Sequence, residues 1–131
     1  MDLNKKVAFV TGASIGLGKG LIEELSKNGC NVVIGYNNSK EKAEWLKKNI
    51  EEKHNVKALS VKCDVTDEKS IKNAISYIVD NFGKIDIIIN NAAYAQDNYI
   101  YDKTKEEFMK VLETNLVGPF LVSKYAYKYM N

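Results

Sequence analysis

The chain has 131 residues, which is room for one domain that buries roughly two-thirds of its unfolded surface. Hydrophobic residues make up 45% of it and the formal net charge is only +2, so the composition is typical of a globular protein and argues against a nucleic-acid or membrane surface. Every basic residue except one histidine is a lysine, so a phosphate would be bound by ammonium groups, hydroxyls, amides or backbone N–H groups. These values favour a domain that binds a small molecule.

Cysteine and histidine usage argues against a disulfide or a metal site. Cys30 and Cys63 fall near opposite ends of two predicted neighbouring strands, which places them roughly 20 Å apart and too far to bridge. His54 stands alone and the sequence has no Cys-x-x-Cys motif, so we expect no bound metal. Residues 1–6 lack the longer apolar stretch of a signal peptide and no run approaches transmembrane length, so we expect a cytoplasmic protein with no membrane partner.

Short apolar runs alternate with amphipathic segments along the chain. Strands are predicted at residues 7–10, 32–36, 58–61 and 85–89. A longer segment with helical period follows each strand, and this alternation predicts an α/β fold with a parallel sheet. Right-handed crossovers then give a partial Rossmann-type sheet in the order 3-2-1-4, with the first two helices on one face and the third and fourth on the other.

The predicted helices have recognisable ends and apolar positions. The first ends at Gly29 and carries three leucines at a spacing of four, namely Leu17, Leu21 and Leu25. The second begins at the N-cap candidate Ser39 and buries Ala43, Leu46 and Ile50. The third begins after Thr66 or Asp67 and ends before Gly83. Its apolar face, the clearest in the chain, consists of Ile71, Ala74, Ile75, Ile78, Val79 and Phe82.

A glycine-rich turn, residues 11–18, joins the first predicted strand to the first helix. Glycines allow a sharp turn and a close approach of a pyrophosphate to backbone N–H groups, and the helix N-terminus adds partial positive charge. The sequence therefore predicts a dinucleotide site where this turn meets the segment after the fourth strand, although a structural turn that binds nothing is the alternative. The cofactor-binding residues predicted in the turn are Gly12, Ser14, Ile15, Gly16, Leu17 and Gly18.

Four segments of the chain, in this order, resemble the short-chain dehydrogenase/reductase family. The turn has Gly-x-x-x-Gly-x-Gly spacing behind Thr11, residues 64–65 are Asp-Val, and residues 90–93 are Asn-Asn-Ala-Ala where the family carries Asn-Asn-Ala-Gly. Residues 114–120 resemble the helical segment that carries the family's catalytic Asn. The resemblance covers nearly the whole chain and is greatest for 3-oxoacyl-[acyl carrier protein] reductases and their sugar-dehydrogenase relatives.

The resemblance implies roles for residues that follow the third and fourth strands. Asp64 and Val65 would contact adenine, by side-chain acceptance and backbone donation; the plainer alternative is that Asp64 only ends a strand. Residues 90–93 would lie beneath the ribose, and the predicted cofactor-binding residues among them are Asn90, Asn91 and Ala92.

The segment after the second strand bears on the choice between NAD and NADP. NAD-binding domains place an Asp or Glu on the adenosine ribose there, whereas this chain has Tyr36. The segment offers hydrogen-bond donors to a 2′-phosphate and no carboxylate, so it favours NADP, although Ile15 takes a place that is often basic in NADP-preferring relatives. A plain turn with a helix cap is the alternative. The residues concerned are Tyr36, Asn37, Asn38, Ser39 and Lys40.

Asn115 is the predicted catalytic residue. It is polar on an otherwise apolar stripe of the fourth helix, and a buried polar group there needs partners. Pro119 lacks the N–H that would bond the Asn115 carbonyl, and its ring pushes that carbonyl away, so the carbonyl can bind water. The resemblance implies that Asn115 holds a water that relays protons; the alternative is that it only joins the helix to a loop. The stripe consists of Phe108, Val111, Leu112 and Leu116.

The family's catalytic Ser and its Tyr-x-x-x-Lys pair lie well downstream of the helical Asn, so we expect residues 1–131 to be a Rossmann domain truncated before that segment. Tyr-x-x-x-Lys matches begin at Tyr36, Tyr99 and Tyr101, but all three precede the Asn helix. The resemblance implies a parent oxidoreductase that transfers hydride between NADP(H) and a small-molecule or acyl-carrier-bound carbonyl substrate. The alternative is a non-catalytic dinucleotide-binding or interaction module.

Truncation would also leave apolar surface uncovered. The last predicted strand, with Ile87, Ile88 and Ile89, would become an open edge, and the last helix would lose the cover of its apolar side chains. We therefore expect a homo-oligomer built on this strand or this helix.

Overall fold

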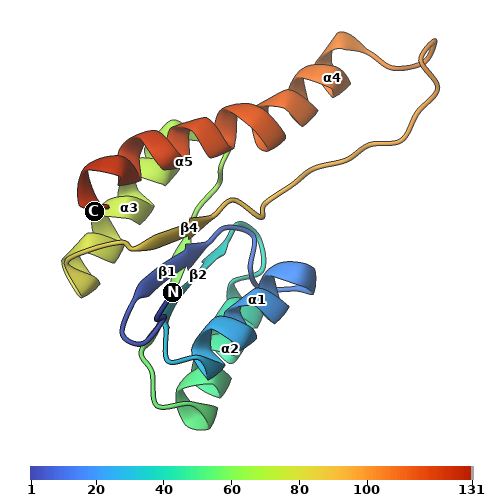
Figure 1. The fold of residues 1–131 in the computed structure, drawn as a ribbon. Helices are drawn as coiled ribbons and strands as arrows, with labels where there is room; N and C mark the ends of the chain where they lie inside the picture. The colour runs from blue at the N-terminus through green and yellow to red at the C-terminus, as the bar shows by residue number, and fades with distance from the viewer. Residues whose placement is uncertain (131) are drawn as a thin grey trace.

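The computed structural model describes residues 1–130 and contains a four-stranded parallel sheet in the order β3-β2-β1-β4 (Figure 1). The strands are β1 (Val7–Val10), β2 (Asn31–Tyr36), β3 (Ala58–Lys62) and β4 (Ile87–Ile89). The predicted α/β class, the parallel pairing and the strand order are confirmed. Asn131, the last residue of the predicted domain, lies outside the described residues.

Helices cover both faces of the sheet, as predicted. On one face lie α1 (Gly16–Lys27) and α2 (Lys40–Lys53), and on the other lie α3 (Glu68–Phe82) and α5 (Gly118–Ala126) (Figure 1). The core is therefore two apolar layers with the sheet between them. The layer under α1 and α2 includes Val10, Ile22, Val32, Ile34, Ala43, Leu46 and Ile50. The layer under α3 and α5 includes Phe9, Val33, Leu59, Ile71, Ile78, Val122 and Ala126.

The buried face of α1 differs from the predicted leucine face. Leu17 is 75% exposed, whereas the buried positions are Gly18, Ile22 and Ser26, with Leu21 and Leu25 only half-buried beside them. A Cβ at Gly18 would lie 2.7 Å from the Ala13 Cα, so the first turn of the helix presses directly on the glycine turn. Because consecutive helical residues are 100° apart, burying Gly18 turns Leu17 outward.

The ends of α2 and α3 follow the sequence in part. Ser39 precedes α2 as predicted, but its side chain makes no capping hydrogen bond. Asp67 caps α3 by accepting the Lys69 N–H at 3.0 Å, and Gly83 ends that helix in the left-handed conformation with φ +75°.

Strand β4 is shorter than predicted, although the Asp86 N–H still donates to the Val7 carbonyl of β1 at 2.9 Å. The Ile85 N–H donates to the Tyr129 carbonyl at 3.2 Å, so this buried residue packs against the end of the last helix. The Asp86 carboxylate accepts the Val7 N–H at 2.8 Å and lies 2.9 Å from the Lys84 ammonium. The Asp86 carboxylate therefore takes up the Val7 N–H, which a longer β4 would need for its backbone hydrogen bonds to β1.

The last predicted helix is one rod with an altered centre: α4 (Lys105–Leu112), a π-helical turn (Glu113–Val117), α5, and a 3₁₀ turn (Tyr127–Tyr129). The Gly118 N–H donates to the Glu113 carbonyl, which is the i to i−5 bond of a π-turn. Pro119 has no N–H, so the α-helical hydrogen bond from residue 119 to the Asn115 carbonyl is also missing in this turn. The predicted buried stripe is wrong, since no residue of α4 is buried and Leu116 is 65% exposed.

Candidate functional site

Thr11 ties the glycine turn to the segment that follows β4. Its hydroxyl oxygen is buried and accepts the N–H groups of Asn91 at 3.1 Å and Ala92 at 3.0 Å. In return, the Asn91 side-chain amide donates to the carbonyls of Thr11 at 3.1 Å and Gly12 at 3.0 Å. These four hydrogen bonds join the carboxyl ends of β1 and β4, which is the switch point of the sheet.

The three glycines of the turn serve different purposes. A Cβ at Gly12, which has φ +59°, would lie 2.9 Å from the Ala92 Cα, and one at Gly18 would lie 2.6 Å from the Asn91 side-chain amide. These two positions need glycine because protein packs against them. Gly16 also has φ +59°, but a Cβ there would meet nothing within 4 Å. The space above Gly16 is therefore open to a ligand.

A cleft of about 670 Å³ opens at the carboxyl end of the sheet, between the glycine turn and the π-turn. It brings together loops from the ends of all four strands, which lie far apart in the sequence. Ten of the predicted cofactor residues line it: Gly12, Ser14, Ile15, Asn37, Asn38, Ser39, Asp64, Val65, Asn91 and Ala92.

Six predicted cofactor residues lie outside this cleft. Tyr36 and Lys40 line a separate groove beside β3, and Gly16 lines a hollow between the turn and α2. Gly18 packs against the Asn91 side chain. Leu17 and Asn90 are exposed.

The cleft also contains side chains for which the sequence analysis assigned no role. Lys110 and Thr114 enter it from the last helix, four residues apart and so on one helical face. Tyr94 enters it directly after the Asn-Asn-Ala-Ala segment, and the Lys110 ammonium lies 4.3 Å from the centre of its ring. The position of Tyr94 directly after the Asn-Asn-Ala-Ala segment could have indicated that it lies at the cleft. The sequence gives no such indication for Lys110, because its approach to the cleft depends on the tertiary fold.

Asn115 is exposed, so the expectation that it is a buried polar group is wrong. Its side chain forms a reciprocal pair with the Tyr94 backbone: the Tyr94 N–H donates to Asn115 Oδ1 at 2.8 Å, and Asn115 Nδ2 donates to the Tyr94 carbonyl at 2.8 Å. The π-turn is therefore fixed to the segment that floors the cleft. This is the connection of helix to loop that the sequence left as an alternative; a water on the Asn115 carbonyl stays a prediction.

The predicted Tyr-x-x-x-Lys matches do not reach the cleft. Tyr99 and Tyr101 are 82% and 97% exposed. They lie in the long connection that leads to α4 (Figure 1). Tyr36 lines the groove beside β3. Lys103 donates to the Gln96 carbonyl at 2.9 Å within the same connection. No such pair lines the cleft among residues 1–130.

An acidic side chain and a thiol with a raised pKa lie at the cleft. Asp64 Oδ1 accepts from the Thr66 N–H at 3.0 Å and from its hydroxyl at 2.7 Å, which forms a turn after β3. Burial, with the negative charge of Asp64, raises the pKa of the Cys63 thiol to about 12. Cys30 and Cys63 are both free thiols, and within residues 1–130 no three His, Cys, Asp or Glu side chains gather into a metal site.

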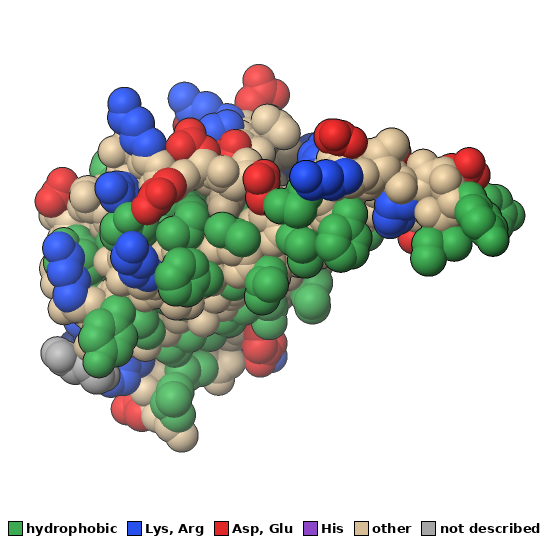
Figure 2. All heavy atoms as spheres, turned by 90° about the horizontal axis from the view of Figure 1, so that it is seen from above, with side chains coloured by type: hydrophobic (Ala, Val, Ile, Leu, Met, Phe, Trp, Pro, Cys, Tyr) green, Lys and Arg blue, Asp and Glu red, His purple; other side chains and the backbone are tan. Residues whose placement is uncertain are grey.

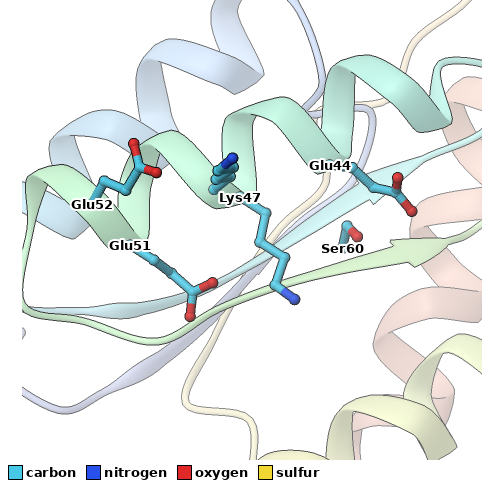
Figure 3. A pocket seen from close by; sticks show the side chains of 6 residues that line it. Glu44, Lys47, Glu51, Glu52 and Ser60 are labelled. Atoms are coloured by element: carbon cyan, nitrogen blue, oxygen red, sulfur yellow. The ribbon is translucent and has the colours of Figure 1, made fainter.

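A second hollow, of about 470 Å³, lies between α2 and β3 (Figure 3). The Lys47 side chain extends across it between the carboxylates of Glu44 and Glu51, so opposite charges compensate one another there. None of its lining residues belongs to the glycine turn or to the segment after β4. It is therefore separate from the cleft at the switch point.

The sequence and the fold identify the family. Residues 6–131 match the family described as short chain dehydrogenase. The chain belongs to this family. It is 37% identical over 115 residues to the 3-oxoacyl-[acyl-carrier-protein] reductase FabG of Staphylococcus aureus, covering 88% of this chain and 46% of that protein. The FabG of Staphylococcus epidermidis is 36% identical over the same length, with 47% of it covered.

Solved structures of other proteins have the same architecture. A variant of a Serratia marcescens short-chain dehydrogenase/reductase superposes over 100% of this chain and 53% of its own, with a TM-score of 0.94 and 29% identity. A blue fluorescent protein from a metagenomic library, solved in complex with NADPH, gives a TM-score of 0.92 and 26% identity, over 99% of this chain and 53% of its own. The chain thus spans about half the length of the curated relatives and solved structures that it matches.

Proposed function

We propose that this chain is the NADP(H)-binding half of an oxidoreductase that interconverts a carbonyl and an alcohol, with 3-oxoacyl thioesters as the substrate class. The observation that carries the proposal is the cleft at the switch point, where the glycine turn and the segment after β4 are joined through Thr11. The names of the curated relatives support the substrate class, and the NADPH complex of a structural relative supports the cofactor.

The chain's own residues fit a dinucleotide. Gly16 leaves open space above the turn, and α1 begins there with backbone N–H groups that have no helical partner. Ser39 makes no capping bond to α2, so its hydroxyl is available on the cleft wall. Val65 and Thr114 would enclose an adenine ring, and Ala92 would floor the ribose. When bound, the nicotinamide would supply or accept the hydride.

Asn115 would act in this reaction through its backbone. Its side chain is engaged with Tyr94, and Pro119 cannot donate to its carbonyl, so the carbonyl is the group left to hold a water. A water there would pass protons to and from the residue that protonates the substrate. The side chain meanwhile positions the floor of the cleft.

A second candidate function is a dinucleotide-binding module without turnover, favoured by the absence of a Tyr-x-x-x-Lys pair from the cleft within residues 1–130. We propose that the purified chain behaves in this way, and that the hydride-transfer activity belongs to a polypeptide that also carries the family's downstream Ser, Tyr and Lys. The test follows NADPH binding by calorimetry and NADPH oxidation with an acetoacetyl thioester.

Binding without oxidation by the purified chain, and oxidation by the longer polypeptide, is the expected result. Oxidation by the purified chain that Tyr94→Phe abolishes would contradict the proposal and would make Tyr94 the acid. Failure of the longer polypeptide to reduce the thioester would remove the substrate class but leave the dinucleotide site standing.

We also propose that the chain self-associates through the face that carries α4 and α5. Hydrophobic side chains gather on this face (Figure 2). Those with large exposed fractions are Phe108, Met109, Leu116, Val117 and Phe120. No helix among residues 1–130 is long and apolar enough to cross a membrane. A cytoplasmic location stays a prediction.

A further inference from the structure

The groove beside β3 has a volume of about 470 Å³ and lies at the open edge of the sheet. Strand β3 is the last strand on that side, and its residues 59–62 form the floor of the groove. One wall is α2 and the other is α3, which cover opposite faces of the sheet. The hollow between α2 and β3 continues the groove, because Glu44, Lys47 and Ser60 line both spaces (Figure 3). The edge of β3 is therefore recessed between two helices.

The backbone groups on this edge are free to bind a ligand. The Cys63 N–H donates to the Tyr36 carbonyl at 2.7 Å, so Cys63 turns its backbone toward β2. Successive residues of a strand point their N–H and C=O groups to opposite sides, so those of Ser60 and Lys62 point into the groove. No backbone hydrogen bond within residues 1–130 reaches these groups. Two main-chain donors and two main-chain acceptors are thus available.

Basic side chains line the groove on the α2 face of the sheet. Lys47 extends over it from α2 (Figure 3). Leu59 packs in the layer under α3, so Lys62, three residues further along the strand, has its side chain on the α2 face. Within residues 1–130 neither ammonium lies within 4.0 Å of a carboxylate, and the Glu44 carboxylate is paired with Lys40 at 4.0 Å. Two cations without an ion pair therefore lie along one side of the edge.

The wall on the α3 face is uncharged. It consists of Asn73, Ala74 and Tyr77, and the Tyr77 side chain is 46% exposed. Because the side chains of a strand alternate between two faces, an extended chain on this edge would present every second side chain to the lysines and the others to this wall. The groove is therefore complementary to a segment in which acidic and apolar residues alternate.

We propose that the groove beside β3 binds an extended acidic segment of another protein, which adds to the sheet as a strand alongside β3. Main-chain hydrogen bonds to Ser60 and Lys62 hold the segment, and the ammonium groups of Lys47 and Lys62 select acidic side chains. A second copy of this chain fits the groove poorly, because the helices that flank its own β3 would meet those of the first copy before the two edges came within hydrogen-bond distance.

The experiment titrates the purified chain with two synthetic peptides, acetyl-Val-Glu-Val-Glu-Val-Glu-amide and the same peptide with Lys in place of Glu. Calorimetry should give a dissociation constant for the glutamate peptide at least about 10-fold lower than for the lysine peptide. Backbone amide resonances of the labelled chain should shift at residues 59–62 and 73–77. Glutamate peptides methylated on the backbone nitrogen of either every Val or every Glu should differ, because only one of these sets faces β3, and methylation of that set should abolish binding.

Charge reversal in the groove tests the role of the two lysines. Lys47→Glu with Lys62→Glu should weaken binding of the glutamate peptide by at least about 10-fold and should strengthen binding of the lysine peptide. Lys27→Glu with Lys53→Glu is the matched control, because it makes the same change in net charge at residues that line neither the groove nor the hollow. It should change the affinity for each peptide by less than about 2-fold.

Four results would overturn the inference: no binding of either peptide at millimolar concentration, equal binding of both, binding that survives both patterns of methylation, or shifts centred on the cleft at the switch point. A fifth is a set of shifts at residues 59–62 that grow with protein concentration, without peptide, in the variant Phe108→Glu with Phe120→Glu. That result would make the edge an interface between copies of this chain. None of these measurements uses NADPH, so the inference and the proposed function stand or fall separately.

Discussion

At the scale of single residues, Thr11 determines how the two halves of the cleft meet. Thr11→Val keeps the volume but removes the oxygen that accepts the Asn91 and Ala92 N–H groups. Leaving two backbone donors without an acceptor should lower the free energy of unfolding by about 2 kcal/mol and weaken NADPH binding. Urea denaturation and calorimetry measure the two effects.

Thr11→Ser is the control for that change, because it retains the hydroxyl and should recover most of the NADPH affinity. Equal stability and affinity for the valine and serine variants would mean that the hydroxyl does not organise the cleft.

The sequence predicted the residues that follow strands better than those that approach from a helix. Asn91 and Asp64 could be placed because the carboxyl ends of parallel strands converge in any fold of this order. Tyr94 and Lys110 could not, because their contact depends on how far the connection to α4 extends before the chain returns. The catalytic role of Asn115 stays a prediction, and its exposure could not be predicted because it depends on the rotation of the last helix, which no local pattern specifies.

At the scale of elements, Asp86 fixes β4 against β1. Burial raises the pKa of its carboxyl, but the hydrogen bonds from Lys84 and the Val7 N–H, with the charges of Lys84 and Lys6, outweigh burial and hold the pKa below its usual value of 3.8. The folded state therefore binds this proton less readily than the unfolded state does. Its stabilising effect is complete above the usual pKa and is lost as the pH falls through the folded pKa.

Asp86→Asn tests this interaction. The variant should be less stable than the parent by about 1 kcal/mol at pH 7, and the difference should shrink as the pH falls below 3.8. Urea denaturation midpoints at a series of pH values measure the difference. A difference that stays constant down to pH 2 would show that the charge of Asp86 is not involved.

The approach of α5 to the end of β3 depends on Gly118. A Cβ there would lie 2.9 Å from the Val65 carbonyl oxygen and 3.0 Å from the Val65 Cβ. Gly118→Ala should therefore lower the free energy of unfolding by about 1–3 kcal/mol, because backbone must move. Gly20→Ala is the matched control: its Cβ would meet nothing within 4 Å, and alanine in a helix should raise stability by about 0.5–1 kcal/mol. Denaturation midpoints that shift in the same direction for both variants would contradict this account.

Glycine contacts also explain which helix faces the sequence could predict. The apolar period of α3 identifies its buried side, because residues 71–78 are apolar at helical spacing. The leucine spacing of α1 is just as regular, but Gly18 must face Asn91 and Ala13, and this turns the helix away from its leucine row. A contact without a side chain leaves no hydrophobic signal in the sequence.

At the scale of the whole molecule, the face with α4 and α5 carries large apolar side chains in water (Figure 2). Phe108 and Phe120 are 55% and 62% exposed. We expect dimers at micromolar concentration, and a shift to monomers when both residues are replaced, as in Phe108→Glu with Phe120→Glu. Sedimentation velocity measures the distribution.

Trp45→Glu provides the control for that shift, because it removes an aromatic side chain that is 58% exposed on the opposite face of the sheet. Its sedimentation should match that of the parent. A parent that sediments only as a monomer, or a tryptophan variant that dissociates equally, would contradict self-association through this face.

The central claim is that a dinucleotide binds at the carboxyl ends of β1 and β4. Titrating the isotopically labelled chain with NADPH and following backbone amide resonances by NMR tests it most directly. The account predicts the largest, saturable shifts at residues 12–17, 37–39, 64–66 and 91–94, with little change in the hollow between α2 and β3. Saturable shifts centred on that hollow, or no saturable shifts at millimolar NADPH, would contradict it.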